Sequence, residues 1–556
     1  MPQKPLKDYQ EDRLERGVYD RRNALNDFTG KEWLFSTKTI IPKVFPSRFP
    51  PPTNSRGLHS LPIDLSQEFI ETFTKPDGII LDPLAGLGST LLAGYYTNMK
   101  FESSDRSIIG LDSDPVNLDK FRKVVDYLKI TNLGKITYEP FSELTQVADN
   151  SINFVLTDML NQSIKENQLT ESQFTAAING WVREVTNKIR NTASKLIENG
   201  YMVLAIPFYN QITTNDEKRS QEWNFALTKL MTTQLNSLGL ILKAERFWFE
   251  PSNSKEEITV IPPQRRFLVL RKESFISNPS QALDFTDQSQ LPIGPTFMLH
   301  RSFPPSFEHK LRGQHGGMKP PELIEYLIRR YSPNQTDLIL DPFVGVGGSL
   351  LGASLARRKA IGIDINTQWQ EVYYEVCRRM QLPEQTYVVG DSTHIVNEII
   401  EDESIGMIMT DVPYWAMDKL RKTRGRFSKA GEESKEKLHS SLKQFDQATI
   451  LTIQEWRDLV QNVFRDCFSK LANGRILAVF IGNMYRTLTE QQEGRSIKVG
   501  RFLLLASSLA EILVSLGYHF REEIVWYAPD KALHIFGYPY SYIPSVVHQS
   551  ILIFEK

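Results

Sequence analysis

The segment TDVPYW, at residues 410–415, joins hydrogen-bond acceptors to aromatic rings directly after the apolar run IGMIM. The carboxylate of Asp411 and the backbone carbonyl of Val412 can each accept one hydrogen of an amine conjugated to a base ring, which draws the lone pair out of conjugation. Tyr414, helped by Trp415, can stack on such a base, and this stacking contributes about 1–3 kcal/mol per base. That energy offsets the cost of flipping a base out of a duplex. The alternative is a strand-end turn with two buried aromatic side chains.

A glycine-rich loop lies earlier in the chain, within LILDPFVGVGGS at residues 338–349. Its glycines permit a tight turn and a close backbone approach to a ligand before a helix begins. No G-K-[ST] follows, which disfavours a nucleoside-triphosphatase loop. Another kind of phosphate loop, or a turn without a ligand, is the alternative. The candidate cofactor-binding residues of the loop are Asp341, Phe343, Gly345, Gly347, Gly348 and Ser349.

A further acidic residue, Asp364, ends the next apolar segment, AIGID. A carboxylate at such a strand tip can accept hydrogen bonds from both ribose hydroxyls of a cofactor, as in dinucleotide-binding folds. The alternative is a helix N-cap, which is common at such a boundary. The glycine loop that precedes it favours the ribose role.

Together these segments resemble the amino-group DNA methyltransferases, which modify adenine N6 or cytosine N4. D-P-F-x-G-x-G is similar to that family's S-adenosylmethionine loop, which faces the methionine part of the cofactor. TDVPYW is similar to its D-P-P-Y motif, with Val412 in place of the first proline. Asp391 resembles the family's adenine-contacting position, although a turn-forming aspartate explains the local sequence GDS nearly as well. The catalytic residues that the resemblance implies are Asp411, Val412, Pro413 and Tyr414.

The same blocks occur twice in the chain, in the same order. IILDPLAGLGST at 79–90 corresponds to 338–349, and later strand-like blocks, including those with Trp248 and Trp526, also match. The first copy keeps Asp112 and Asp158 but has TDMLNQS where the second has TDVPYW. We therefore expect the first copy to be non-catalytic: a partner surface, a target-recognition half or a cofactor-binding relic.

Strand-like apolar runs alternate with amphipathic stretches such as 349–358 and 499–517, which predicts mostly parallel sheets covered by helices. The expected fold class is α/β, with two doubly wound Rossmann-like methyltransferase domains. The resemblance covers about residues 30–275 and 295–556, most strongly for the motifs of the second copy. The predicted division is an N-terminal extension at 1–30, a degenerate domain at 31–276, a linker at 277–294 and a catalytic domain at 295–556.

A basic stretch, AMDKLRKTRGRFSK at 416–429, follows the catalytic motif and suits phosphate contacts, although a solvated loop is the alternative. The predicted nucleic-acid contacts are Trp415, Lys419, Arg421, Lys422, Arg424 and Arg426. The net charge of −1 shows no global basic field, so a nucleic acid must be held by such a local patch.

The two cysteines, Cys377 and Cys467, are expected on helices, which argues against a cytosine-C5 methyltransferase because that chemistry needs a cysteine nucleophile. They exclude a Cys-rich zinc site as well, and no metal site is expected. Neither a signal peptide nor a membrane span is indicated, so a cytoplasmic location is expected.

The function expected from these features is site-specific methylation of an exocyclic amine of DNA by S-adenosylmethionine, with adenine N6 favoured over cytosine N4. The setting that the resemblance implies is restriction-modification or phage defence, with a restriction endonuclease or defence-system partner. The alternatives are an RNA base methyltransferase and a non-catalytic nucleic-acid-binding protein.

Overall fold

The computed structural model describes most of the chain in ten ranges. These are 22–46, 61–158, 185–206, 235–251, 259–261, 265–273, 296–302, 306–413, 453–531 and 541–556. Residues 48, 232 and 533 are also described. Within the ranges, the residues not described are 102, 103, 113, 141–143, 145, 146, 188, 316, 333, 493 and 494.

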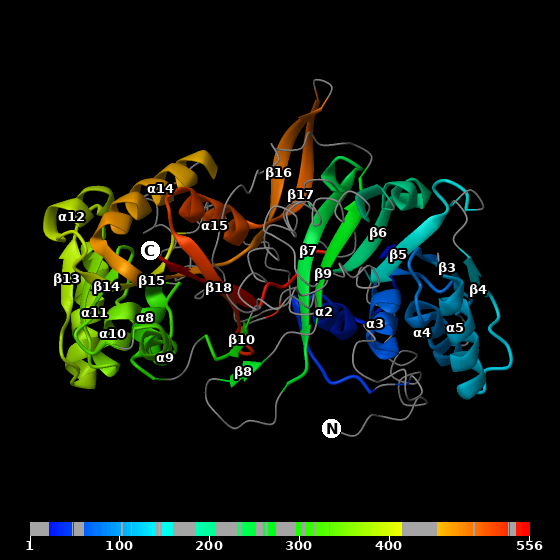
Figure 1. The fold of residues 1–556 in the computed structure, drawn as a ribbon, viewed down its shortest axis with the longest axis horizontal. Helices are drawn as coiled ribbons and strands as arrows, with labels where there is room; N and C mark the ends of the chain where they lie inside the picture. The colour runs from blue at the N-terminus through cyan, green and yellow to red at the C-terminus, as the bar shows by residue number, and fades with distance from the viewer. Residues whose placement is uncertain are drawn as a thin grey trace.

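Two large sheets, one in each half of the chain, organise the protein (Figure 1). The first has the order β1-β7-β9-β6-β5-β2-β3-β4 and the second β13-β12-β11-β14-β15-β19-β18-β10-β8. The strands of the first sheet are β1 (Ile40–Pro42), β2 (Ile79–Asp82), β3 (Ser107–Asp112), β4 (Ile136–Pro140), β5 (Ile152–Asp158), β6 (Leu196–Ile206), β7 (Leu240–Phe249) and β9 (Arg265–Lys272). Those of the second are β8 (Thr259–Ile261), β10 (Thr296–Leu299), β11 (Leu338–Asp341), β12 (Lys359–Asp364), β13 (Thr386–Val389), β14 (Ile405–Asp411), β15 (Leu471–Ile481), β18 (His519–Tyr527) and β19 (His548–Glu555).

The two sheets repeat one topology, which confirms the predicted α/β fold with mostly parallel strands. In each sheet one internal strand, β9 or β19, runs antiparallel to both of its neighbours. The two tryptophans that match in sequence also match in structure. Trp248 donates its ring N–H to the carbonyl of Lys43 at 2.8 Å, and Trp526 donates to that of His300 at 2.9 Å. Both bonds hold the end of the strand that precedes the glycine-loop strand, which is β1 at the edge of the first sheet and β10 between β18 and β8 in the second.

Helices cover the sheets at matching places in the two halves (Figure 1). They are α2 (Gly30–Ser36), α3 (Ile63–Phe73), α4 (Ser89–Lys100) and α5 (Pro115–Tyr127) in the first half, and α8 (His309–Arg312), α9 (Pro321–Tyr331), α10 (Gly348–Leu355), α11 (Thr367–Met380), α12 (Ser392–Ile399), α14 (Ile453–Lys470) and α15 (Leu505–Ser515) in the second. Cys377 and Cys467 lie buried in α11 and α14, as predicted.

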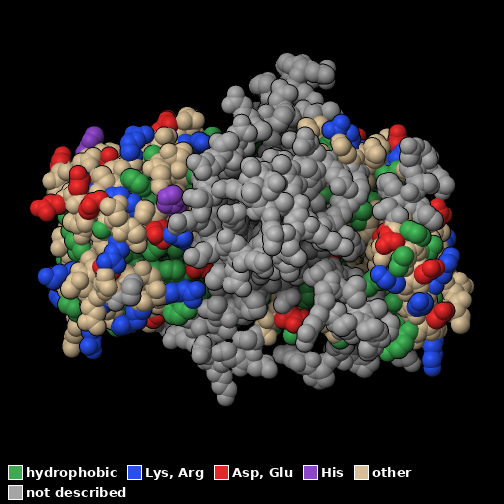
Figure 2. Space-filling view, in the orientation of Figure 1, with side chains coloured by type: hydrophobic (Ala, Val, Ile, Leu, Met, Phe, Trp, Pro, Cys, Tyr) green, Lys and Arg blue, Asp and Glu red, His purple; other side chains and the backbone are tan. Residues whose placement is uncertain are grey.

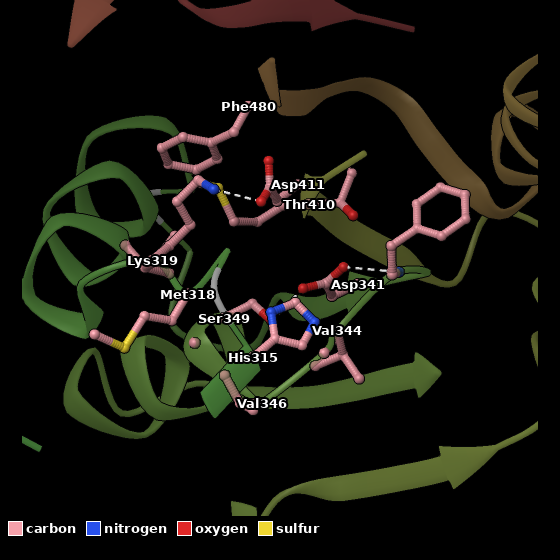
Figure 3. Close-up of a pocket in the computed structure, with 15 residues that line it drawn as sticks. His315, Met318, Lys319, Asp341, Val344, Val346, Ser349, Thr410, Asp411 and Phe480 are labelled. Carbon is pink, nitrogen blue, oxygen red and sulfur yellow. Dashed lines mark hydrogen bonds and ion pairs between the residues drawn. The ribbon is translucent and has the colours of Figure 1, made fainter. Parts of the chain in front are cut away.

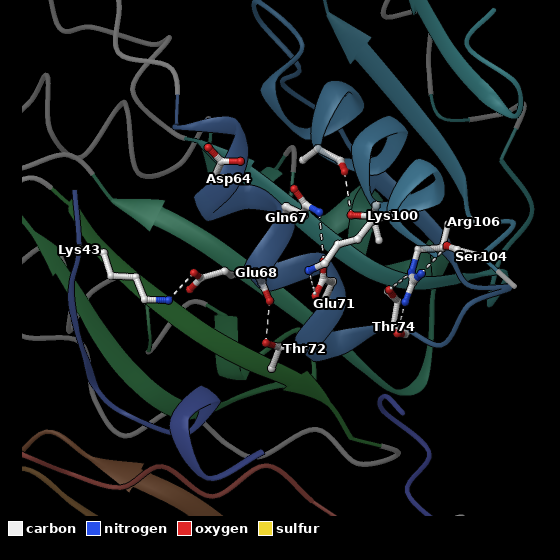
Figure 4. A network of polar contacts seen from close by, with 12 residues as sticks. Lys43, Asp64, Gln67, Glu68, Glu71, Thr72, Thr74, Lys100, Ser104 and Arg106 are labelled. Carbon is white, nitrogen blue, oxygen red and sulfur yellow. Dashed lines mark hydrogen bonds and ion pairs between the residues drawn. The ribbon is translucent and has the colours of Figure 1, made fainter. Parts of the chain in front are cut away.

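Helix α9 places the segment just before it against the glycine loop. Pro321 occupies its first turn, where a missing N–H costs nothing. A Cβ on Gly352 of α10 would lie 2.4 Å from Ile324, so only glycine allows α9 and α10 to approach this closely. In the first half, α3 is tied down by polar contacts: Glu71 accepts from Gln67 and Lys100, and Arg106 donates to Thr74 (Figure 4).

Two features of the second half differ from the sequence expectation. The stretch 499–517 is not helical throughout, because Arg495–Leu503 form β17, which pairs with β16 (Met484–Gln492) in a two-stranded hairpin. Phe502 of β17 packs into the core of the first half, so this apolar pattern serves an interface. Strand β8, inside the range predicted for the first domain, pairs antiparallel with β10 of the second sheet.

The two halves share buried polar and apolar contacts. Arg266 on β9 forms ion pairs with Glu245 on β7, at 3.3 Å between N and O, and with Glu523 on β18, at 2.9 Å. All three side chains are buried. Glu245 and Glu523 fall at matching places in the two copies, so one arginine lies between two related carboxylates. Tyr542, from the second half, packs in the core of the first beside Phe73.

Across the described residues, no helix has the length and apolar character needed to span a bilayer. On the face shown in Figure 2, Lys and Arg side chains are interspersed with Asp and Glu over the described parts of both halves. The described surface on this face therefore carries no large field of one sign.

Candidate active site

A cavity lies at the carboxyl ends of β11 and β14, where ligands bind in open α/β sheets (Figure 3). The cavity and its open mouth together contain about 420 Å³ of empty space, part of which is open to solvent. Its lining includes the predicted residues Asp341, Phe343, Gly345, Gly348, Ser349 and Asp411. The structure thus brings the glycine loop and the catalytic candidate into one site.

The loop is built around the buried carboxylate of Asp341. Asp341 accepts from the backbone N–H of Phe343 at 2.9 Å and from the hydroxyl of Ser349. Burial raises the pKa of Asp341 to about 7, and the nearby charge of Asp411 adds to this, while its hydrogen bonds oppose it. Gly347 has a φ of +76°, and a Cβ there would lie 2.2 Å from the ring of Tyr373. The turn therefore requires glycine for both backbone and packing reasons.

Asp364, at the end of β12, fastens the same loop. One of its oxygens accepts from the N–H of Gly345 at 3.0 Å and the other from that of Asn366 at 2.9 Å. The N-cap of the following helix is Asn366, so the N-cap alternative for Asp364 does not describe its contacts. A carboxylate offers about four lone-pair positions, so both oxygens keep acceptor capacity for ribose hydroxyls.

Asp391 caps α12, as the turn alternative expects. Its side chain accepts from the N–H and the hydroxyl of Thr393, at 2.9 and 2.8 Å, and it does not line the cavity described above. A role for Asp391 at the adenine of a cofactor stays a prediction.

Asp411 ends β14 and points into the cavity beside Lys319 (Figure 3). One carboxylate oxygen is ion-paired with the ammonium of Lys319. The other, Oδ1, is buried and accepts no hydrogen bond from any residue that the structure describes. Burial raises the pKa of Asp411, and the charge and hydrogen bond of Lys319 oppose that rise.

The next two residues of the motif are held in place. Val412 is buried, and its N–H donates to the carbonyl of Phe480 at 3.4 Å. The carbonyl of Pro413 accepts from the ring N–H of Trp456 at 2.8 Å. The other predicted residues of this region lie outside the described residues: Tyr414, Trp415, Lys419, Arg421, Lys422, Arg424 and Arg426.

Sequence reasoning missed two residues that line the cavity, Lys319 and His315. His315 lies over Gly345, where an added Cβ would be 2.9 Å from its ring nitrogen Nε2. Burial lowers the pKa of His315 to about 4, and the charges of Lys319 and Arg312 act in the same direction, so its ring is neutral at pH 7. A signal was present, because both residues fall in HGGMKPP, directly before the helix that precedes the glycine loop.

The first half repeats the glycine loop, but the aspartate at the end of β5 pairs with a different cation. Gly86 donates to Asp112 at 2.8 Å, just as Gly345 donates to Asp364. Asp158, which matches Asp411, faces Arg265 of β9 at 3.9 Å, and both side chains are buried. Lys319 comes directly before Pro320, the N-cap of α9, and the residue at that place before Pro62, the N-cap of α3, is the buried Leu61. The two sites therefore differ in which element supplies the cation.

A family model described as DNA methylase, N6_N4_Mtase, matches residues 136–375. Over this range, which is 240 of the 556 residues, the chain is similar to the N6/N4 DNA methylases. The matched range contains Asp158, the glycine loop and Asp364, and it ends before Asp411. Members of that family are S-adenosylmethionine-dependent methyltransferases.

Several solved structures are similar to the chain at low identity. TrmN from Thermus thermophilus is 15% identical over 56% of this chain and 60% of its own, with a TM-score of 0.28. The Thermus thermophilus 16S rRNA methyltransferase RsmC, in complex with AdoMet and guanosine, is 13% identical over 90% and 93%, with a TM-score of 0.24. Phosphoethanolamine N-methyltransferase 2 of Haemonchus contortus is 13% identical over 80% and 85%, with a TM-score of 0.23. No curated protein matches the chain significantly.

The residues of the cavity fit the cofactor of this family. S-adenosylmethionine carries a sulfonium cation, and two carboxylates, the buried Asp341 and the partly buried Asp411, face a cavity with one ion-paired lysine. The neutral ring of His315 adds no opposing charge at pH 7. The glycine loop and Asp364 are the residues that would hold the methionine and ribose parts.

Gly347→Ala is expected to abolish cofactor binding, because the new methyl group would overlap the ring of Tyr373 at a φ of +76°. Gly474→Ala is the matched control, since Gly474 has a φ of +71° and no atom within 4 Å of an added Cβ. The control should lose only about 1–2 kcal/mol of stability from the left-handed backbone. Calorimetry with S-adenosylmethionine on the folded variants measures the difference, and equal affinities would contradict this account.

Asp158→Asn is expected to leave methyl transfer nearly unchanged, because Asp158 faces the buried Arg265 of β9 rather than a lysine placed as Lys319 is in the second half. The variant should be less stable, since a buried guanidinium loses its charged partner. Methyl transfer per folded molecule is the measurement. A loss as large as that of an Asp411 variant would show that the first half carries the reaction.

Proposed function

We propose that the chain transfers a methyl group from S-adenosylmethionine to an exocyclic amine of a DNA base, with adenine N6 as the favoured target and Asp411 as the catalytic carboxylate. The observation that carries this proposal is the buried oxygen Oδ1 of Asp411. It accepts no hydrogen bond within the described structure and lies in the same cavity as the glycine loop. A buried acceptor of this kind is costly unless a ligand satisfies it.

The chemistry follows from the properties of the amine. S-adenosylmethionine supplies a methyl group on its sulfonium, and the amine nitrogen is a weak nucleophile because its lone pair is conjugated with the ring. Asp411 accepts one amine hydrogen through Oδ1, and the carbonyl of Val412 accepts the other. Positive charge that develops on the nitrogen is stabilised by the carboxylate in a site with little water.

When bound, S-adenosylmethionine would give up its methyl group to the nitrogen, and its sulfur would keep the electron pair of the broken C–S bond as a neutral thioether. The nitrogen would then release one proton, and Asp411 is the base proposed to accept it. The aspartate at the start of Asp-Val-Pro-Tyr supports adenine N6, because cytosine N4 enzymes more often begin this motif with serine. Tyr414 is proposed to stack on the flipped base, with Trp415 beside it.

DNA is the proposed macromolecular substrate, bound through the basic stretch 416–429. The mixed charge of the described surface in Figure 2 supports the use of a local segment rather than a whole face. Arg421 and Arg424 lie at the centre of this stretch, where they would contact phosphates next to the flipped base. A role in restriction-modification or phage defence is part of this proposal.

The deciding experiment follows transfer of labelled methyl groups from S-adenosylmethionine to duplex DNA and to RNA of matched sequence. We expect label in DNA, recovered as N6-methyladenine after digestion to nucleosides. Label in RNA alone would replace this proposal with an RNA base methyltransferase. Label in neither, with the cofactor bound, would favour a non-catalytic nucleic-acid-binding protein.

A further inference from the structure

We propose that Lys319 is a positioning residue that holds Asp411 in its ionised form and turns the free oxygen of Asp411 towards the substrate amine. This inference rests on the proposed role of Asp411. It adds a residue from the segment before α9, which lies 92 positions away from Asp411 in the chain.

The backbone of Lys319 is fixed from two sides. Its carbonyl oxygen accepts a hydrogen bond from the guanidinium of Arg312 at 2.6 Å. The same oxygen packs closely on Gly348, since a Cβ added to Gly348 would lie only 3.1 Å from it. The side chain is buried, and its ammonium also donates to the carbonyl of Gly317 at 3.2 Å. Lys319 is therefore held by Arg312 and by its own segment, with its carbonyl oxygen beside Gly348 of the glycine loop.

The ammonium of Lys319 contacts only one of the two oxygens of Asp411. It is ion-paired with Oδ2, and it lies 5.6 Å from the centre of the Phe480 ring, next to Asp411 on the neighbouring strand (Figure 3). Because one oxygen is held, the carboxylate cannot rotate freely, and Oδ1 keeps one direction into the cavity. A fixed acceptor costs no reorganisation during the reaction.

Charge is the second part of the role. Burial favours the protonated form of Asp411, and a protonated carboxyl could not stabilise positive charge on the amine. The other titratable groups near this pair do not replace Lys319. Asp341 is a second acid, and His315 is neutral at pH 7.

Two further cations act on this segment without pairing with Asp411 in the described structure. Arg312 donates to the backbone of Lys319. Lys531 lies close enough to Lys319 for the two positive charges to repel each other. Burial lowers the pKa of Lys531 to about 8, and the charge of Lys319 acts in the same direction. Lys319 is thus the cation that counters the buried charge of Asp411.

The first test is the pH profile of methyl transfer to DNA by the full chain, at saturating cofactor. In Lys319→Met we expect the acid limb of kcat to move to higher pH, with roughly a tenfold or greater loss at pH 6 and a smaller loss at pH 9. Lys319→Arg should restore much of the profile, because it returns the charge. The matched control is Lys470→Met, since Lys470 is similarly buried and pairs with Asp402 at 2.7 Å, away from the cavity.

The second test does not depend on activity. Lys319→Met leaves Asp411 partly buried and without the lysine counter-charge. The melting temperature of the variant should therefore fall more at pH 8 than at pH 5. The double variant Lys319→Met/Asp411→Asn should lose that pH dependence. Equal losses at both pH values, or a raised KM for the cofactor with an unmoved pH profile, would overturn the proposal. If the wild-type chain methylates no DNA, the proposed function fails, and the melting data still decide whether Lys319 keeps Asp411 ionised.

Discussion

Asp411→Asn should reduce methyl transfer to DNA by about 10²–10³-fold while S-adenosylmethionine still binds. The substitution keeps the size of the side chain and one acceptor oxygen, but removes the charge that faces the amine. The glycine loop and Asp364 are held by their own hydrogen bonds, so the cofactor site should persist. Single-turnover rates with DNA, together with calorimetry for the cofactor, measure the two effects separately.

The control for this variant is Asp158→Asn, which makes the same chemical change at the matching position of the first half. DNA affinity should change little in either variant, because phosphate contacts supply most of it. Full activity in Asp411→Asn would remove Asp411 from the reaction. Loss of cofactor binding in the same variant would show that the carboxylate serves the cofactor site.

Arg266→Met should destabilise the protein by about 3–5 kcal/mol at pH 8, because it leaves Glu245 and Glu523 buried without their shared counter-charge. Burial raises the pKa of both carboxyls, and Arg266 opposes that rise. Carboxyls with raised folded-state pKa values stabilise the folded state below their unfolded values, near pH 4, and this contribution is lost as pH rises. Denaturation of the full chain at pH 5 and pH 8 should therefore show the larger loss at pH 8.

The matched control is the triple variant Arg266→Met/Glu245→Gln/Glu523→Gln, which removes all three charges. Both glutamines can keep polar contacts, because Asn483 and Ser550 lie within hydrogen-bond distance of the two carboxylates. We expect the triple variant to recover part of the stability and to lose the pH dependence. A single variant that is equally unstable at both pH values would show that packing, rather than charge, explains the loss.

Much of the fold could be predicted from local sequence. The short apolar runs that end in Asp82, Asp112, Asp341 and Asp364 form strands β2, β3, β11 and β12. They could be predicted because the residues that favour a buried strand and a glycine turn are adjacent in the sequence. The same locality explains why the loop and Asp411 could be assigned to one edge of the sheet. The prediction of a helix over the whole stretch 499–517 was wrong in part, because an apolar pattern does not distinguish a strand buried at an interface from a helix.

Contacts between distant segments could not be predicted in this way. The pairing of Lys319 with Asp411 depends on how α9 packs on α10, and the pairing of Arg266 with Glu523 joins positions 257 residues apart. Nothing in the sequence next to Lys319 or Arg266 indicates which distant carboxylate each residue pairs with. Such residues become visible only when the sheets and helices that carry them are placed.

Strand β8 leaves the first half to join the second sheet, and Tyr542 leaves the second half to fill the core of the first. Each half thus contains a piece of the other, so we expect the two halves to fold together. A first half that packs into the second in this way would be retained for folding even if it carried no methyl-transfer site of its own.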